Sequence, residues 1–312
     1  MIVKKIVKSF AKGVKMCNFL SGYATEKEIK IDPFSDSHQD QIEENGDRKV
    51  EICKFEIVPD FNNFFDVSVW RFKIDQDIIP EWCDVNELEI SVRAKVADLL
   101  LECPQNEEIL VCSKKVLAIG GSTNIKQLVG FGVVRFMFDN SQIGKMRDNS
   151  QIGKMHGNSQ IGEMWNNSQI GEMYSNSQIG KMHGNSQIGE MWDNSSVNQM
   201  WNTSSVGEMY NNSQIRKMRG NSQIGKMHGN SQIGEMYNNS QIGKMHGNSQ
   251  IGEMWNNSQI GEMYSNSQIG KMYSNSRIGK MCNNSQIGEM WDNSQIGEMH
   301  SNSQIIKDGR VK

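Results

Sequence analysis

Residues 158–166 read Asn-Ser-Gln-Ile-Gly-Glu-Met-Trp-Asn, and residues 167–175 repeat the pattern as Asn-Ser-Gln-Ile-Gly-Glu-Met-Tyr-Ser. This nine-residue unit recurs from Asn140 to Asn302, with Lys or Glu prevailing at position six and planar or basic side chains at position eight. A unit of nine residues is too short for a helical hairpin, and it buries its apolar side chains only against its neighbours. The repeat therefore predicts extended units stacked on one another.

Within one unit, the alternation of a strand places Ser141 and Ile143 on the same face. Gly144 then permits a bend that turns Met146 inward as well. Position nine holds Gly, Asn, Asp or Ser, which tolerate left-handed backbone or form Asx turns. Each unit is thus predicted to be a short strand, a bend and a corner, with Ser, Ile and Met in the interior.

The charges at position six indicate how many units complete one coil. At a separation of 18 residues, opposite charges outnumber like charges, as in Lys145 with Glu163 and Glu253 with Lys271, whereas at 27 residues they do not. Opposite charges on neighbouring strands stabilise a sheet. The pattern therefore favours a parallel β-solenoid with two nine-residue repeats per coil.

The unit also persists upstream in degenerate form, with Val116 and Ile119 at its Ile and Met positions. We therefore expect degenerate capping repeats over residues 113–139, the regular solenoid over 140–305 and a C-terminal tail over 306–312. The coils would number about eleven and span ~50 Å at one strand spacing per coil. The expected fold class is mainly β.

The unit at 158–166 resembles those of short-repeat parallel β-solenoid proteins of bacterial and phage genomes, which are distant in kind to pentapeptide-repeat proteins. The resemblance covers the repeats and includes no catalytic motif. Calcium-binding nonapeptide repeats need a Gly-Gly-x-Gly-x-Asp loop, whereas Asp is only occasional in the corners here, as at Asp148 and Asp193. The sequence therefore implies no calcium, no other metal and no cofactor.

With two units per coil, position eight forms two rows of side chains ~4.8 Å apart. These rows predict either stacking that stabilises the coils or a surface that binds a glycan, a polymer or a protein. The candidate ligand-binding residues are the Trp and Tyr side chains of both rows. In the first row they are Trp165, Trp201, Tyr237, Trp255, Tyr273 and Trp291, and in the second Tyr174, Trp192, Tyr210 and Tyr264.

Other repeat positions favour structural roles. Asn at position one is expected to form an internal amide ladder, as stacked Asn does in cross-β arrays. Met at position seven is expected to fill the core rather than to hold a cofactor. Glu163, Glu190 and Glu253 interrupt any basic track beside the aromatic rows, and the chain has 33 Lys and Arg against 36 Asp and Glu. We therefore expect no nucleic-acid partner.

The N-terminal third differs in character. Residues 1–20 predict an amphipathic basic helix that packs on the adjoining domain or, alternatively, contacts an anionic membrane or a partner. Residues 21–112 predict a small α+β capping domain, with a polar loop over 35–48 and strands over 50–57 and 66–74. Asp84 and Glu87 predict the capped start of a helix that ends before Pro104.

No catalytic constellation is evident, since His38 stands in a polar stretch without a nucleophile beside it. We expect a protein that is not an enzyme, with an enzyme inside residues 21–112 as the alternative. The six cysteines form no CxxC pair, and no signal peptide or membrane span is evident, so a cytoplasmic location is expected.

The function expected from these features is that of a structural rod or protein-interaction scaffold. The alternative is a carbohydrate- or polymer-binding module that uses the Trp, Tyr and His rows. The solenoid has almost no sequence beyond Ile305 to cover its last coil, which also predicts end-to-end association between copies.

Overall fold

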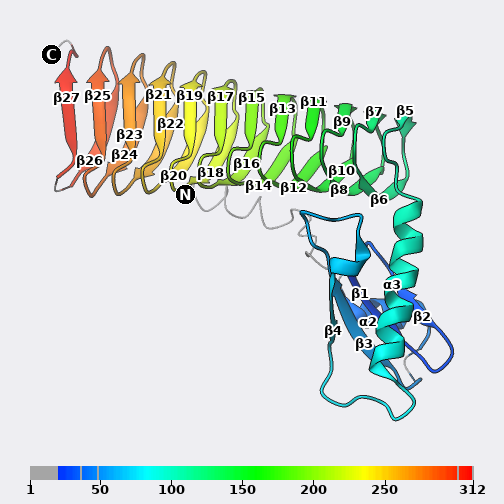
Figure 1. The fold of residues 1–312 in the computed structure, drawn as a ribbon. Helices are drawn as coiled ribbons and strands as arrows, with labels where there is room; N and C mark the ends of the chain where they lie inside the picture. The colour runs from blue at the N-terminus through cyan, green and yellow to red at the C-terminus, as the bar shows by residue number, and fades with distance from the viewer. Residues whose placement is uncertain (1–19, 36, 48, 301, 311–312) are drawn as a thin grey trace. The chain divides into compact units, whose positions relative to one another are not determined.

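The structure, a computed structural model, describes residues 20–310 apart from residues 36, 48 and 301. The chain divides into two compact units, an α+β unit and a parallel β-solenoid (Figure 1). The basic helix predicted for residues 1–20 falls outside the described residues except for Leu20, which begins a strand.

The α+β unit contains a four-stranded antiparallel sheet of order β2-β1-β3-β4. Along β3 the side chains of Cys53, Phe55 and Ile57 are fully buried and alternate with half-buried ones, as expected for a sheet with one face on a core. The elements are β1 Leu20–Ala24, β2 Ile29–Ile31, α2 His38–Glu44, β3 Cys53–Val58, the 3-10 helix η2 Val67–Val69, β4 Arg71–Ile74 and α3 Val85–Leu101.

Two local expectations were wrong. The stretch 35–48 is not a loop throughout, because Ser37 caps helix α2 by accepting a hydrogen bond from the amide of Asp40, and Ile42 is buried. The segment 66–74 is not one strand, because the Asp66 carboxylate accepts the amide of Ser68 at 3.0 Å and winds the next residues into η2. Within this segment the strand is limited to β4, Arg71–Ile74.

Helix α3 confirms its predicted start. The Asp84 carboxylate accepts the amides of Asn86 at 2.8 Å and Glu87 at 3.1 Å. The buried residues Leu88, Val92, Val96 and Leu100 recur at the spacing of one helix face. The role of this unit as a cap for the solenoid remains a prediction.

The solenoid consists of two parallel sheets whose strands alternate along the chain (Figure 1). The 12-stranded sheet contains β5 Glu108–Cys112, β7 Asn124–Leu128, β9 Gln142–Met146, β11 Gln160–Met164, β13 Gln178–Met182, β15 Ser196–Met200, β17 Gln214–Met218, β19 Gln232–Met236, β21 Gln250–Met254, β23 Gln268–Met272, β25 Gln286–Met290 and β27 Gln304–Asp308. The 11-stranded sheet contains β6 Lys115–Ile119, β8 Val133–Met137, β10 Gln151–Met155, β12 Gln169–Met173, β14 Gln187–Met191, β16 Ser205–Met209, β18 Gln223–Met227, β20 Gln241–Met245, β22 Gln259–Met263, β24 Arg277–Met281 and β26 Gln295–Met299.

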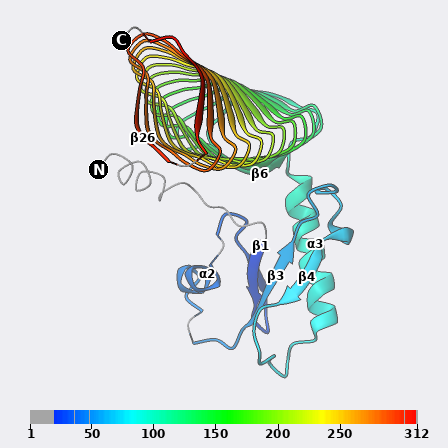
Figure 2. The same ribbon diagram turned by 90° about the vertical axis from the view of Figure 1, so that its left-hand side faces the viewer.

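The strand register confirms two units per coil. Ile161 on β11 pairs with Ile143 on β9 and with Ile179 on β13, so equivalent residues of adjacent coils lie 18 positions apart. Figure 2 shows the coils nearly end-on, with the two sheets facing each other and each coil turned slightly against the last. This turn is the usual twist of stacked strands.

The interior confirms the predicted positions. Ser141 and Met146 are fully buried, and Ile143 is 1% exposed. Glycine at position five has a steric reason, because a Cβ on Gly162 would lie 2.5 Å from the carbonyl oxygen of Gly144 in the preceding coil. Asn198, Arg216 and Ile306 replace glycine at this position, and nothing in the structure explains how their Cβ atoms are accommodated.

Each corner is a tight turn from position eight to position two. The amide of Ser168 donates to the carbonyl of Trp165 at 3.3 Å, and Asn166, first of the two central residues, has φ of 61°. Positive φ at this place defines the mirror-image turns that favour Gly, Asn and Asp. The composition of position nine follows from this conformation.

The solenoid begins before the expected first unit at Ser113. Strand β5 pairs with β7 through Ile109 and Ile125, which lie 16 residues apart instead of 18. The first coil is therefore two residues shorter than the others, and its first strand falls out of phase with the nine-residue pattern. Because of this phase shift, the nine-residue periodicity does not predict β5.

The Asn ladder exists, but its expected internal position was wrong. Nδ2 of Asn158 donates to Oδ1 of Asn140 at 3.3 Å, and Asn176 continues the ladder to Asn158 at the same distance. These side chains are exposed, because position one lies in the turn. The buried polar row is formed by Ser at position two.

Candidate functional site

The first row of position-eight side chains is stacked along the rod. The rings of Trp165 and His183 lie 4.2 Å apart between centroids, and those of Trp255 and Tyr273 lie 3.9 Å apart. The guanidinium of Arg219 lies 4.9 Å from the ring centre of Trp201, which is cation–π geometry. The residues of this row therefore cover one another's ring faces.

The second row is stacked in the same way. Trp192 and Tyr210 have centroids 3.9 Å apart, and His246 and Tyr264 have centroids 4.9 Å apart. The planes are within 11° of parallel in both pairs. Most rings of both rows are half-buried, so solvent reaches mainly their edges.

The polar atoms of many rings bond to position six of the same strand. Nε1 of Trp165 donates to Oε2 of Glu163 at 3.0 Å, and the phenol of Tyr237 donates to Oε2 of Glu235 at 2.7 Å. This hydrogen bond is the first cause of the lowered pKa of Glu163 and of the pKa of Tyr237, raised to about 12. The same bond is made by Tyr174, Trp192, Tyr210, Trp255, Tyr264 and Trp291.

The sequence carries a signal for these bonds that the period alone does not reveal. Glu at position six is followed at position eight by Trp, Tyr or, once, His300. Lys at position six is followed instead by His or Arg in most units, with Tyr273, Cys282 and Gly309 as the exceptions. A carboxylate thus precedes a hydrogen-bond donor two residues later, and position eight is coupled to position six.

The charges at position six also pair between coils. Nζ of Lys217 lies 2.9 Å from Oε2 of Glu235, and Nζ of Lys244 lies 2.8 Å from Oε2 of Glu262. The predicted pair of Lys145 and Glu163 is present at 3.6 Å. Such half-exposed pairs contribute little individually and select one register collectively.

Four histidines at position eight favour the neutral form. Burial lowers the pKa of His156 to about 4, helped by the charge of Lys154. Burial likewise lowers the pKa of His228 and of His246. Neutral rings can stack on tyrosine without introducing charge between coils.

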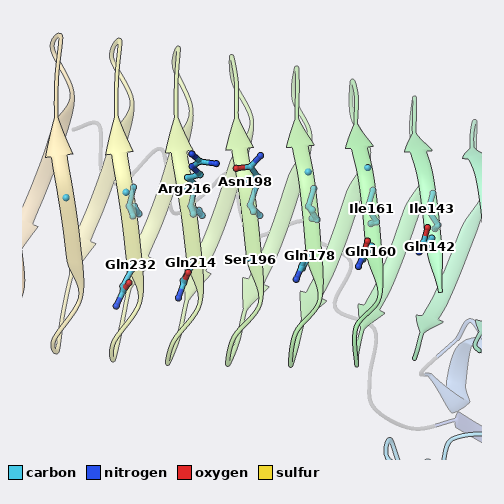
Figure 3. A pocket seen from close by; sticks show the side chains of 18 of the residues that line it. Gln142, Ile143, Gln160, Ile161, Gln178, Ser196, Asn198, Gln214, Arg216 and Gln232 are labelled. Atoms are coloured by element: carbon cyan, nitrogen blue, oxygen red, sulfur yellow. The ribbon is translucent and has the colours of Figure 1, made fainter. Parts of the chain in front are cut away.

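A long groove follows the outer face of the 12-stranded sheet from β7 to β23 (Figure 3). Its volume is about 1280 Å³, and it is lined mainly by Gln, Ile and Gly at positions three, four and five. The glutamine side chains that line this groove, such as Gln160 and Gln232, are exposed. The 11-stranded sheet carries a shorter groove of about 360 Å³ near its C-terminal end, from β20 to β26.

The structure brings the predicted aromatic residues together into the two rows, although their role as a ligand site remains a prediction. The groove could not be predicted from the sequence, because the repeat units of both sheets have the same amino-acid sequence. Among the described residues, no group of three or more His, Cys, Asp or Glu side chains is placed to hold a metal ion. No helix in this part of the chain is long and apolar enough to cross a bilayer.

Comparison of the chain with protein-family models, with curated proteins and with solved structures finds no match.

Proposed function

We propose that the protein acts as a structural rod and protein-interaction scaffold without enzymatic activity. The observation that carries this proposal is the use of the aromatic rows in coil-to-coil contacts, with ring faces stacked and polar atoms bonded to position six. Such a solenoid repeats one surface at every coil over ~50 Å. Repetition of this kind suits a spacer or a platform for several partner molecules.

The alternative is a glycan- or polymer-binding module that uses the aromatic rows. Sugar rings bind to exposed aromatic faces, and in these rows neighbouring rings cover the faces. The rows therefore support the scaffold better than the glycan module. We also propose that the protein is related to the short-repeat solenoid proteins of bacterial and phage genomes. A cytoplasmic location is proposed as well, and cell fractionation tests it.

A triple variant with Trp165→Ser, Trp201→Ser and Trp255→Ser separates the two functions. We expect a lower melting temperature from lost stacking, and no glycan bound by either protein on a glycan array. Glycan binding by the wild type that the variant loses, with an unchanged circular dichroism spectrum, would instead establish the aromatic rows as a binding site. A matched protein pull-down with the full chain tests the scaffold itself.

A further inference from the structure

We infer that the groove on the 12-stranded sheet is an interface with a second copy of this chain. The inference rests on the proposed scaffold function and names one partner for it. Position three forms a ridge of exposed glutamines such as Gln160, and position five forms a furrow of glycines such as Gly162. Ridge and furrow run side by side along the rod, two residues apart on each strand (Figure 3).

This pairing of ridge and furrow is self-complementary for one symmetry operation. A two-fold axis parallel to the rod, midway between the rows, places the glutamines of each copy over the glycines of the other. Glutamine ladders that interdigitate across paired sheets form dry, close-packed contacts. Because the sheet twists, the two parallel rods wind about each other.

The interruption of the furrow supports the same symmetry. In β15 the furrow is filled by Asn198, and in that strand the ridge residue is the short Ser196 instead of glutamine. The two-fold axis sets Ser196 of one copy against Asn198 of the other, so a filled furrow meets a shortened ridge. In the adjacent strand β17 the same axis sets Arg216, which points toward Asn198 (Figure 3), against the full-length ridge residue Gln214 of the other copy, so the matched change is confined to β15.

The size and charge of the face also suit a dimer. Nine strands at ~4.8 Å and five residues at ~3.3 Å give roughly 700 Å² per copy, or roughly 1,400 Å² in total, within the range of specific interfaces. From Gln142 to Gly270, Arg216 is the one charged residue that lines the groove itself, and the paired charges of position six, such as Lys217 and Glu235, follow the glycines along each strand and form the rim of the face. Interface cores are depleted of charge in the same way.

The test is sedimentation equilibrium of the full chain over a range of concentrations. Lysine at Gln160, Gln178 and Gln232 places a charge over each facing glycine furrow and like charges on the neighbouring ridges of the two copies, and we expect it to raise the dimer Kd at least tenfold. The matched control places lysine at Gln169, Gln187 and Gln241, which hold the same repeat position in the 11-stranded sheet, and should change Kd less than twofold. Circular dichroism verifies that both variants are folded.

A second variant, Ser196→Gln, sets a full ridge residue against the filled furrow and should also weaken the dimer. The inference is overturned if the chain is a monomer at every concentration. It is also overturned if only Ile306→Lys, on the last strand, disrupts the dimer, because that result indicates end-to-end association. A third outcome also overturns the inference. In that outcome the chain binds a neutral glycan, the first lysine variant abolishes this binding, and Ser196→Gln leaves it unchanged. Capture of other proteins by a monomeric chain leaves the scaffold function standing, so the two failures are distinguishable.

Discussion

The phenol of Tyr237 donates a hydrogen bond to Oε2 of Glu235 at 2.7 Å, two residues earlier on β19. The carboxylate of Glu235 in turn lies 2.9 Å from Nζ of Lys217 in the preceding coil. One carboxylate thus connects a ring of the stacked row to the charge ladder of position six.

Replacing this carboxylate should release the tyrosine. Since the hydrogen bond to Glu235 is the first cause of the Tyr237 pKa of about 12, Glu235→Ala should return that pKa toward its ordinary value of 10.0. Difference absorbance of the phenolate on alkaline titration measures the shift. Glu235→Gln keeps an acceptor oxygen without the charge, so an equal shift in both variants would contradict a role for the hydrogen bond.

Acid should loosen the second row before it affects the carboxylates. The folded pKa values of His156, His228 and His246 lie below the ordinary value of 6.5, so folding favours their neutral forms. This contribution to stability is complete above pH 6.5 and is lost as the pH falls toward about 4, the pKa of His156. Melting temperatures between pH 7 and pH 4.5 measure it.

The control for the acid effect replaces these three histidines with tyrosine, which occupies equivalent positions at Tyr174, Tyr210 and Tyr264. The variant should lose much of its pH dependence between pH 6.5 and 4.5. A melting curve that shifts with pH as much as that of the wild type would assign the effect to other groups.

The corner at Gly184 should tolerate asparagine and reject valine. Gly184 has φ of 64°, and the same corner position holds Asn166 and Asn202 at φ of 61° and 59°. Left-handed backbone costs other residues ~1–2 kcal/mol, most of all β-branched ones. Urea unfolding should therefore show a loss of that size for Gly184→Val and a small change for Gly184→Asn.

Shortening one core side chain should destabilise its strand and the two strands that pair with it. Ile233 is 2% exposed, so Ile233→Ala should lower the free energy of unfolding by about 2–5 kcal/mol. Hydrogen exchange should accelerate first in β17, β19 and β21, since each coil pairs with its neighbours. The exposed Gln232→Ala serves as control, and an equal loss there would refute the assigned register.

The solenoid was predictable because every unit meets the same requirements. Burial of Ser141, Ile143 and Met146 and the left-handed corner at position nine each follow from residue chemistry repeated at fixed spacing. The charge ladder then selected two units per coil. The same sequence pattern occurs in many units, so one aberrant coil does not change the fold that the pattern predicts.

Other features depend on single events and left no periodic signal. Strand β5 is out of phase because one corner is two residues short. Helix α2 depends on the cap at Ser37 and the burial of Ile42 within a polar stretch. The groove arises from exposure of Gln160 and its equivalents on one sheet, whereas the units of the other sheet have the same residues and different exposure.

The register has a consequence for insertions and deletions. Ile161 and Ile179 occupy equivalent places because two units separate them. Loss of one nine-residue unit would move all downstream residues to the opposite sheet and exchange their charge and ring partners, whereas loss of two would only remove one layer. The identical segments 152–180 and 242–270 are offset by an even number of units, so each residue of one segment lies on the same sheet as its counterpart in the other.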